Sequence, residues 1–415
     1  MHEPIMIRIM SATNWKNGIA VSLCAGAVVW AANGAGARFR AVEIDHGIEI
    51  GYGLAVADVD GDGKPDIVLA DKKQIVWYRN PKWEKFVLVE NLTKLDNVCV
   101  AATDIDGDGK AEIAVGAEWN PNDTINSGAV FYLIAPTDRT QKWEAVELPH
   151  EPTVHRMRWV RDADGKFNLV VVPLHGRGNK NGEGAGVRIL SYKMPANPKD
   201  EWKTELLSDS MHMTHNFEPV RWTQSGAAEL LVAGKEGVFD FIQDRKGWDS
   251  RQLVGKREND STFAGCGEVR TGKLKSAKTT NSFPNYFLAT IEPMHGNQVA
   301  VYTAPSVDAA TGLWERQVLD SSFKEGHALA CGDLLGLGSD QIVAGWRAKN
   351  AAGKVGIKLY WAQDSAGKEW KETLVDDDTM ACEDLCLADL DGDGKLDIVA
   401  AGRATKNVKL YFNQR

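Results

Sequence analysis

The chain has 415 residues, of which 43% are hydrophobic, and it contains 40 glycines and 14 tryptophans, which is ample apolar material for a large folded core. Its formal net charge is -9 at pH 7 and no basic stripe is visible, so composition argues against a nucleic-acid partner.

The N-terminal segment, residues 1–37, has the features of a secretory signal. Arg8 and Lys16 form a basic region, and an apolar run from Ile19 to Ala32 is too short to span a bilayer comfortably. Ala35-Gly36-Ala37 matches an A-x-A cleavage site. We therefore expect a secreted or periplasmic protein with no membrane span in the mature chain; the alternative is an uncleaved N-terminal anchor.

A repeated unit follows, in which a short strand, a loop and a second strand succeed one another. The strands are rich in β-branched residues and alternate polar with apolar positions, which is typical of half-buried strands. In the strongest copies the loop is rich in Asp and Gly, as in DVDGDGKPD, and in the weaker copies it has lost its acidic residues. Seven copies are recognisable, beginning near Leu54, Val100, Met157, Val220, Glu268, Ala330 and Leu387.

A tryptophan opens a later strand in six of the seven repeats. The positions are Trp83, Trp143, Trp202, Trp248, Trp314 and Trp370. The seventh such strand is predicted at the start of the mature chain, where Phe39 to Ile44 has the same pattern and would pair with Val408 to Phe412. This arrangement predicts that residues 38–415 form an all-β, seven-bladed β-propeller closed by its N-terminal strand, which removes the exposed sheet edge. An open β-solenoid or a sandwich array is the alternative.

Three of the loops place carboxylates at positions 1, 3, 5 and 9, with glycines that allow a tight turn. Hard oxygen ligands at this spacing suit Ca²⁺ or Mg²⁺, although such loops can also be closed by hydrogen bonds to their own backbone. In either case the role is structural. The carboxylates are Asp58, Asp60, Asp62 and Asp66, then Asp104, Asp106, Asp108 and Glu112, and finally Asp389, Asp391, Asp393 and Asp397.

Histidines recur at one position of the repeat, six residues before the first loop carboxylate or its equivalent. The residues there should open the innermost strand of each blade and ring the central axis: Tyr52, Val98, His155, His215, a residue near Gly265, His327 and Glu383. Converging imidazoles bind transition metals such as Zn²⁺ or Mn²⁺. We predict that His155, His215 and His327 are the ligands, with Glu383 as a fourth ligand or as a base.

The ends of the second strands should lie on the same face and form a rim around this ring. They carry His175, Lys235, His295, Arg347 and Arg403, and His212 lies just before His215. We predict that His175 and His295 transfer protons and that Arg403 takes part in catalysis. Tyr52, His212, Lys235 and Arg347 are predicted to bind substrate. The assignment can also be exchanged, with one rim histidine as ligand and one ring histidine as base.

Five cysteines follow the signal segment, an odd number that leaves at least one thiol without an intrachain partner. Their spacing matches no zinc ribbon, and we expect small residues buried in strands. They are Cys99, Cys266, Cys331, Cys382 and Cys386.

These motifs carry a resemblance to two related groups of sequences. The Asp loops resemble FG-GAP/VCBS repeats. The segments LHGRG (174–178), MTHNFEPV (213–220), TIEPMHGNQVAVYT (290–303), GHAL (326–329) and ADLDGDGKLDIVAAGRATKNVKLYF (388–412) resemble the N-terminal propeller of aldos-2-ulose dehydratases and their bacterial relatives. In that family the propeller cleft holds a metal ion and eliminates water from a keto-sugar such as 1,5-anhydrofructose, with a histidine moving the proton. The cupin and lectin domains of the fungal enzymes have no counterpart in this sequence, so the isomerisation attributed to the cupin part is not implied here.

The resemblance implies a metal-dependent lyase or dehydratase that acts by β-elimination on a small oxidised sugar, including 3-keto-glycosides. A ketone acidifies the neighbouring C–H, a cation on the carbonyl stabilises the enediolate, and a neutral histidine accepts the proton. Two alternatives remain open: a non-catalytic propeller that binds a glycan or protein, and a lyase for uronic-acid polysaccharides.

Overall fold

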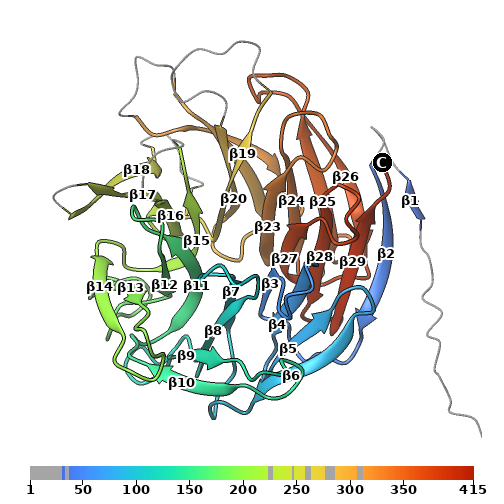
Figure 1. The fold of residues 1–415 in the computed structure, drawn as a ribbon. Helices are drawn as coiled ribbons and strands as arrows, with labels where there is room; N and C mark the ends of the chain where they lie inside the picture. The colour runs from blue at the N-terminus through green and yellow to red at the C-terminus, as the bar shows by residue number, and fades with distance from the viewer. Residues whose placement is uncertain are drawn as a thin grey trace, which may run out of the picture.

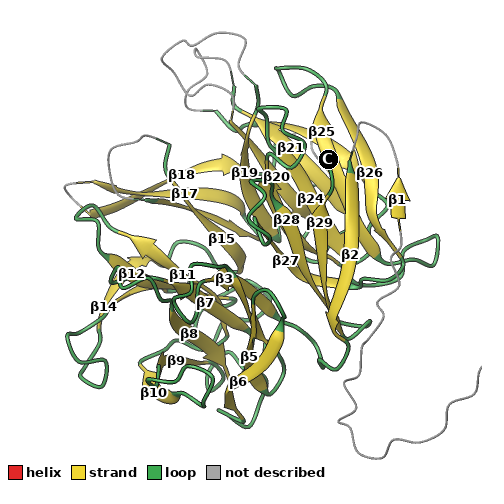
Figure 2. Cartoon of the chain, turned by 45° about the vertical axis from the view of Figure 1, so that its right-hand side comes forward, coloured by secondary structure: helices red, strands yellow, loops and turns green. Residues whose placement is uncertain are grey.

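The computed structural model describes residues 30–32, 37–222, 228–244, 247–257, 263–275, 286–305 and 312–415. Its strands form seven antiparallel sheets arranged around a central axis (Figure 1). The described residues contain strands and loops but no helix (Figure 2). The predicted all-β, seven-bladed propeller is therefore confirmed.

Each of the first four blades uses four consecutive strands, the first being innermost. In chain order they are β3 (Gly53–Ala57), β4 (Asp66–Ala70), β5 (Gln74–Arg79) and β6 (Glu84–Glu90); β7 (Cys99–Thr103), β8 (Glu112–Ala117), β9 (Ala129–Ile134) and β10 (Glu144–Leu148); β11 (Val154–Arg161), β12 (Phe167–Pro173), β13 (Ile189–Lys193) and β14 (Lys203–Ser208); and β15 (Thr214–Val220), β16 (Glu229–Gly234), β17 (Gly237–Asp244) and β18 (Gly247–Val254).

Blades five and six repeat this order, and blade seven takes its outer strands from the N-terminal part of the chain. The strands are β19 (Glu268–Lys273), β20 (Tyr286–Glu292), β21 (Gln298–Thr303) and β22 (Glu315–Asp320); β23 (Gly326–Gly332), β24 (Gln341–Trp346), β25 (Gly356–Ala362) and β26 (Trp370–Asp377); and β27 (Cys382–Ala388), β28 (Asp397–Gly402) and β29 (Asn407–Asn413), followed in the sheet by β2 (Arg38–Asp45) and β1 (Trp30–Ala32).

The ring closes where β2 lies antiparallel to β29. Phe39 is opposite Asn413, Arg40 is opposite Phe412, and the pairing continues to Asp45 opposite Val408, with one bulge. The predicted closure by the N-terminal strand is therefore present. β1, which falls at the end of the predicted signal segment, pairs with β2. The remainder of that segment, apart from Ala37, lies outside the described residues.

The apolar core lies between neighbouring blades. Trp77 of blade one packs in one cluster with Val115 of blade two, and Tyr78 of blade one packs in another with Leu410 of blade seven. A fully buried side chain of this kind contributes on the order of 2 kcal/mol relative to an exposed one. The blades thus hold one another through their faces, while hydrogen bonds hold the strands within each blade.

The five cysteines after the predicted signal are free. Four of them lie in strands, and Cys266 comes shortly before β19. The described part of the chain contains no helix long and apolar enough to cross a membrane.

The first strand of each blade runs from one face of the disc to the other, so its two ends lie on opposite faces. The ring positions, at the beginning of β11, β15, β23 and β27, lie on one face, and the Asp loops, at the end of β3, β7 and β27, lie on the other. A strand of five to eight residues spans roughly 17–26 Å. We call the first the histidine face and the second the Asp-loop face.

Candidate active site

A β-bulge places each ring residue at the axis in four of the seven blades. The pairing of the first strand with the second shifts register around His155, His215, His327 and Glu383. A bulge leaves its extra residue unpaired and re-aims the side chain. These four side chains thereby leave the ordinary alternation of the strand, and all four are buried at 5% exposure or less.

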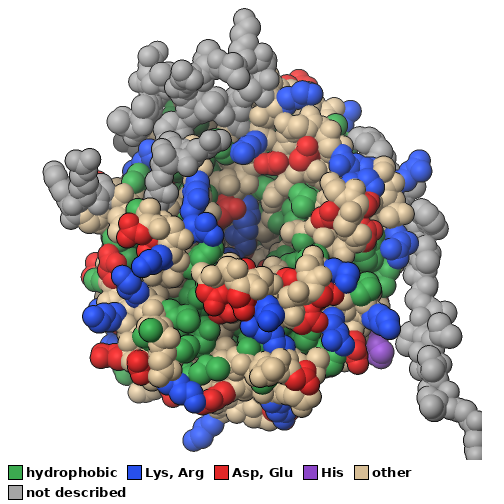
Figure 3. Space-filling model, viewed as in Figure 1, with side chains coloured by type: hydrophobic (Ala, Val, Ile, Leu, Met, Phe, Trp, Pro, Cys, Tyr) green, Lys and Arg blue, Asp and Glu red, His purple; other side chains and the backbone are tan. Residues whose placement is uncertain are grey.

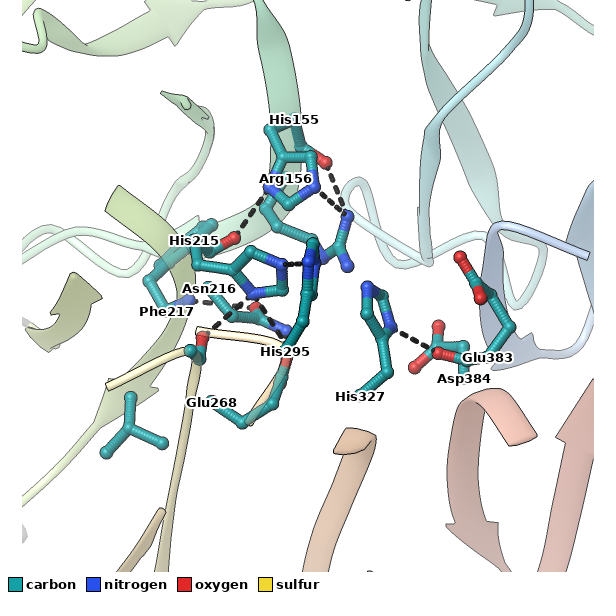
Figure 4. A network of polar contacts seen from close by, with 12 residues as sticks. His155, Arg156, His215, Asn216, Phe217, Glu268, His295, His327, Glu383 and Asp384 are labelled. Atoms are coloured by element: carbon teal, nitrogen blue, oxygen red, sulfur yellow. Dashed lines mark hydrogen bonds and ion pairs between the residues drawn. The ribbon is translucent and has the colours of Figure 1, made fainter. Parts of the chain in front are cut away.

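Three histidines form one compact group, which we call the three-His group. His215, His295 and His327 each offer a ring nitrogen, and these nitrogens lie within 4.8 Å of one another (Figure 4). His215 Nδ1 lies 2.9 Å from the carbonyl oxygen of Gly267, and His327 Nδ1 lies 2.6 Å from that of Glu383. Because each Nδ1 donates its proton to a carbonyl, the Nε2 atom keeps a free lone pair.

His295 reaches the group from the loop between β20 and β21. Its backbone has φ 53°, in the left-handed region that residues other than glycine rarely adopt. Its Nε2 lies 2.8 Å from Nε2 of His215. Two imidazole nitrogens at this distance need either a shared proton or a common cation between them, because two facing lone pairs repel.

His155 lies beside the group but is engaged elsewhere. Its ring centroid is 4.6 Å from that of His215, and its Nδ1 lies 2.7 Å from the carbonyl oxygen of His215. Arg156 Nη1 donates to His155 Nε2 at 3.1 Å. The lone pair that a metal would need is therefore used by the guanidinium of Arg156. The third histidine of the cluster is His295, whereas the sequence predicted His155 at that position.

Burial and positive charge keep these imidazoles neutral at pH 7. Burial first, and then the charge of Arg156, lower the pKa of His155 and of His215 well below 6.5. Burial and then Arg347 do the same for the pKa of His327, and burial lowers the pKa of His295 to about 2. Neutral imidazole is the form that binds metals and accepts protons.

Glu383 is held by two arginines of the predicted rim. Arg347 Nη1 lies 2.9 Å from both carboxylate oxygens, and Arg403 Nη1 lies 2.9 Å from one. Arg403 also lies over the ring of Tyr52, whose hydroxyl donates to Asp96 at 3.1 Å. Arg347 and Arg403 thus point toward Glu383 and form a salt-bridge network with it, and its role as a fourth ligand or base stays a prediction.

The remaining predicted residues lie farther out on the histidine face. His212 pairs with Glu236 at 3.0 Å. Lys235 donates to the carbonyl oxygen of Asn181 at 3.0 Å. His175 is outside the three-His group and lines a separate pocket.

Arg156 and Glu268 belong to the site but were not predicted from the sequence. Glu268 is buried behind His215, with Oε1 3.2 Å from His215 Nδ1, and Asn216 donates to its other oxygen at 2.6 Å. Arg156 directly follows a ring histidine, and strand alternation would turn it away from the site. The bulge cancels that alternation, and the sequence carries no signal that marks the bulge.

Along the axis toward the Asp-loop face, the first strands line a cavity of about 370 Å³. Arg158, Glu218, Arg270 and Asp384 contribute charged side chains to its wall. Figure 3 shows the hollow at the centre of the disc, with basic and acidic side chains inside it. Burial raises the pKa of Glu218 to about 7.

The Asp loops gather carboxylates in part as the spacing predicts. In each loop three carboxylate oxygens lie within 4.8 Å of one another: Asp58, Asp60 and Asp62; Asp104, Asp106 and Asp108; and Asp389, Asp391 and Asp397. Asp60 Oδ1 is buried without a hydrogen-bond partner, which fits a cation ligand.

Other loop carboxylates are engaged by the protein itself. Asp58 accepts hydrogen bonds from the backbone N–H groups of Gly61 and Gly63, at 2.7 Å each. Asp66 accepts two backbone hydrogen bonds and, like Glu112, stands apart from its cluster, while Asp393 pairs with Lys395. The position-9 residue therefore joins the cluster only in the last loop.

The fold and the repeated loops define a seven-bladed β-propeller of the FG-GAP type. Residues 58–115 match the FG-GAP-like repeat family, and residues 100–133 match the FG-GAP repeat. Residues 127–305, which include His155, His215 and His295, match the family described as the β-propeller domain of aldos-2-ulose dehydratase. The resemblance drawn from the sequence is confirmed.

A curated relative gives the same indication. The chain is 24% identical over 271 residues to aldos-2-ulose dehydratase from Phanerodontia chrysosporium. The match covers 60% of this chain and only 29% of that enzyme, so it concerns one part of a much longer protein.

Two solved structures have the same fold at low identity. A chain of the mitotic checkpoint complex superposes with a TM-score of 0.52 at 13% identity, covering 99% of both chains. The extracellular domain of a hybrid two component system from B. thetaiotaomicron gives a TM-score of 0.50 at 10% identity, covering 90% of this chain and 39% of that one. These likenesses concern the fold alone.

Proposed function

We propose that the chain is a metal-dependent carbon–oxygen lyase that carries out β-elimination on a keto-sugar or keto-glycoside. The observation that carries the proposal is the three-His group, in which His215, His295 and His327 direct ring nitrogens to one centre. The distant similarity to a dehydratase propeller supports the same reaction class. Substrates of the 1,5-anhydrofructose, aldos-2-ulose or 3-keto-glycoside type fit it.

The three-His group has the donor set of a Zn²⁺ or Mn²⁺ site with open positions. The Nδ1 atoms of His215 and His327 are fixed by carbonyl oxygens, which orient these two rings as metal-binding histidines require. A divalent cation held there would supply Lewis-acid stabilisation of the charge that develops on the ketone oxygen.

The protein's own groups supply the proton transfer in this proposal. Arg156 turns to the ketone oxygen of the substrate, on which negative charge develops, and this frees Nε2 of the neutral His155 as a proton acceptor. The proton on the carbon next to the ketone then moves to His155, its electron pair forms the C=C bond, and the C–O bond to the leaving group breaks. The leaving oxygen takes this proton back from His155 and departs as water or an alcohol, which returns His155 to its neutral form. His295 as ligand and His155 as base is the exchanged form of the sequence-based assignment.

We also propose that the chain is exported through its N-terminal signal and that Ca²⁺ or Mg²⁺ binds the Asp loops in a structural role. The engagement of Arg347 and Arg403 with Glu383 leaves fewer free cations for a uronic-acid polymer, so a small neutral sugar is preferred.

The test is direct observation of the enone product. Pure protein is incubated with keto-sugars and keto-glycosides, and the new ultraviolet absorbance is followed with and without a transition-metal chelator. Substituting Asn for His215 or His327 should abolish metal binding and activity together, and His155→Asn should keep the metal and lose activity. A matched control is His46→Asn, an exposed histidine remote from the ring. Absence of enone with every sugar would contradict the proposal and leave a binding propeller, whereas activity that survives complete metal removal would contradict the metal dependence.

A further inference from the structure

A second polar pocket lies on the histidine face, between the loops of blades two and three. Residues 121–125, His175 and residues 179–181 line it, and we call it the His175 pocket. Its volume of about 450 Å³ lies within the range of small-molecule sites. The reaction proposed above makes no use of it.

The walls of the pocket are held by a backbone hydrogen bond between the two loops and by hydrogen bonds from the side chain of Asn179. The backbone N–H of Gly178 donates to the carbonyl oxygen of Thr124 at 3.0 Å, which ties the two loops together. The amide of Asn179, itself fully buried, donates to the carbonyl oxygens of Ala185 at 2.9 Å and His212 at 3.1 Å. A pocket fixed in this way is ready to bind without first ordering its loops.

His175 contributes an imidazole with unused hydrogen-bonding capacity. The residue is only 8% exposed, and its Nδ1 is buried without a partner. Burial lowers the pKa of its ring, so the imidazole is neutral at pH 7. A buried N–H without an acceptor costs more than an unused lone pair, so the proton belongs on Nε2, which is then a donor for a ligand.

The other lining groups are those that recognise sugar hydroxyls. Asn122, Thr124, Lys180 and Asn181 bring amide, hydroxyl and ammonium groups, and the side chain of Ile125 is 58% exposed at the same place. Sugar rings present hydroxyls around their edge and C–H groups on their faces. An uncharged polyol with one apolar face matches this lining better than an anion, because Asp123 also belongs to it.

The pocket adjoins the axial site through two short connections. The loop that forms one wall begins at Trp119, whose ring stacks on His155 with centroids 4.9 Å apart. On the other side, Thr153 Oγ1 bonds both the backbone N–H and the carbonyl of His175, and Thr153 lies two residues before His155. These two connections join the walls of the His175 pocket to His155, which lies beside the three-His group.

We propose that the His175 pocket is a second sugar subsite, which holds the ring attached to the oxidised sugar. This inference rests on the proposed function and deepens it: the substrate is a glycoside of at least two rings, with its keto ring at the three-His group. His175 then binds the neighbouring ring through a hydrogen bond and is not the proton acceptor.

The experiment compares a 3-keto-disaccharide with the methyl glycoside of the same 3-keto sugar. For His175→Ala and Thr124→Ala we expect the KM for the disaccharide to rise about tenfold, the equivalent of one lost hydrogen bond, with little change in kcat. The kcat/KM for the methyl glycoside should stay within about twofold, as it should for both sugars in the control His46→Ala. Thr124→Ala serves if loss of the His175 ring harms folding, because only the backbone of Thr124 takes part in the loop contact.

Two results would overturn the subsite. An equal fall in kcat on both sugars would make His175 a catalytic residue, and unchanged kinetics in both variants would show that the pocket binds nothing during turnover. Calorimetry with the unoxidised disaccharide separates this inference from the proposed function, because that sugar cannot react. Binding that weakens about tenfold in His175→Ala supports the subsite even if no keto-sugar is eliminated; no binding to the wild-type protein contradicts it.

Discussion

The buried imidazole of His155 contacts the buried guanidinium of Arg156. This contact makes the stability of the folded state depend on pH. Burial and then Arg156 hold its pKa well below 6.5, whereas in the unfolded chain it titrates near 6.5. Below pH 6.5 the His155 side chain therefore binds a proton in the unfolded chain but not in the folded chain. The contribution of His155 to stability is complete above that pH and is lost as the pH falls, at about 1.4 kcal/mol per pH unit.

We predict that His155→Asn removes this part of the pH dependence. The free energy of unfolding of the wild type, minus that of the variant, should be about 1.4 kcal/mol smaller at pH 5.5 than at pH 7.5. Urea unfolding of the metal-free proteins measures it, and taking a difference cancels the opposing titration of Asp66 and Glu112, whose pKa values burial raises to about 7. If the His155 difference stays constant with pH, the folded and unfolded chains bind the proton equally, and the fold does not lower the pKa of His155.

The repeat fixes where some of the predicted residues lie, whereas local geometry decides the contacts of others. The count back from the Asp loop identified His215 and His327, because equivalent positions in different blades lie on one circle. It could not show that Arg156 donates a hydrogen bond to Nε2 of His155, or that a left-handed backbone turns His295 inward. Neither feature recurs in the other repeats, so the repeat alignment carries no sign of it.

At the scale of the element, β2 is the strand on which closure depends. It pairs with β29 over its length and buries Phe39 in the core cluster between blades six and seven. Without it, β29 becomes an unprotected edge and that cluster loses part of its apolar cover.

We predict that deleting residues 38–46 lowers the midpoint of thermal unfolding by 10 °C or more, roughly the effect of several kcal/mol in a protein of this size. The matched control is a chain that begins at Ala37. It keeps β2, and its midpoint of thermal unfolding should lie close to that of the full chain. Differential scanning calorimetry measures both. An unchanged midpoint in the deletion would show that the ring does not depend on closure by this strand.

The strands themselves were predictable because each blade repeats the same alternation and six of the seven repeat the same opening tryptophan. The bulges in β11, β15, β23 and β27 were not, although they aim the site. A bulge shifts the polar and apolar alternation by one residue, but only one strand residue precedes each of these bulges, so the shift appears only in the pairing register.

For the whole molecule, the decisive feature is that the two sets of candidate cation sites lie on opposite faces of one disc. The Asp loops join first and second strands, whereas the three-His group stands where the first strands begin. The sequence predicted this separation from connectivity alone. The ligand chemistry also differs, because carboxylate oxygens prefer Ca²⁺ or Mg²⁺ and imidazoles prefer transition metals.

The two sites should therefore respond to different chelators. A Ca²⁺-selective chelator should lower the thermal midpoint while the axial metal content stays unchanged, because binding to the folded loops adds stability in proportion to the logarithm of cation concentration. Asp60→Asn, which alters an oxygen buried without a partner in the first loop, should weaken this response. His215→Asn should do the reverse, losing the axial metal and keeping the Ca²⁺ response. Metal analysis and calorimetry on both variants provide the measurement.

If Ca²⁺ and Mg²⁺ leave the thermal midpoint of the wild type unchanged, the loops are closed by their own backbone hydrogen bonds. Asp58 already accepts such hydrogen bonds from the N–H groups of Gly61 and Gly63.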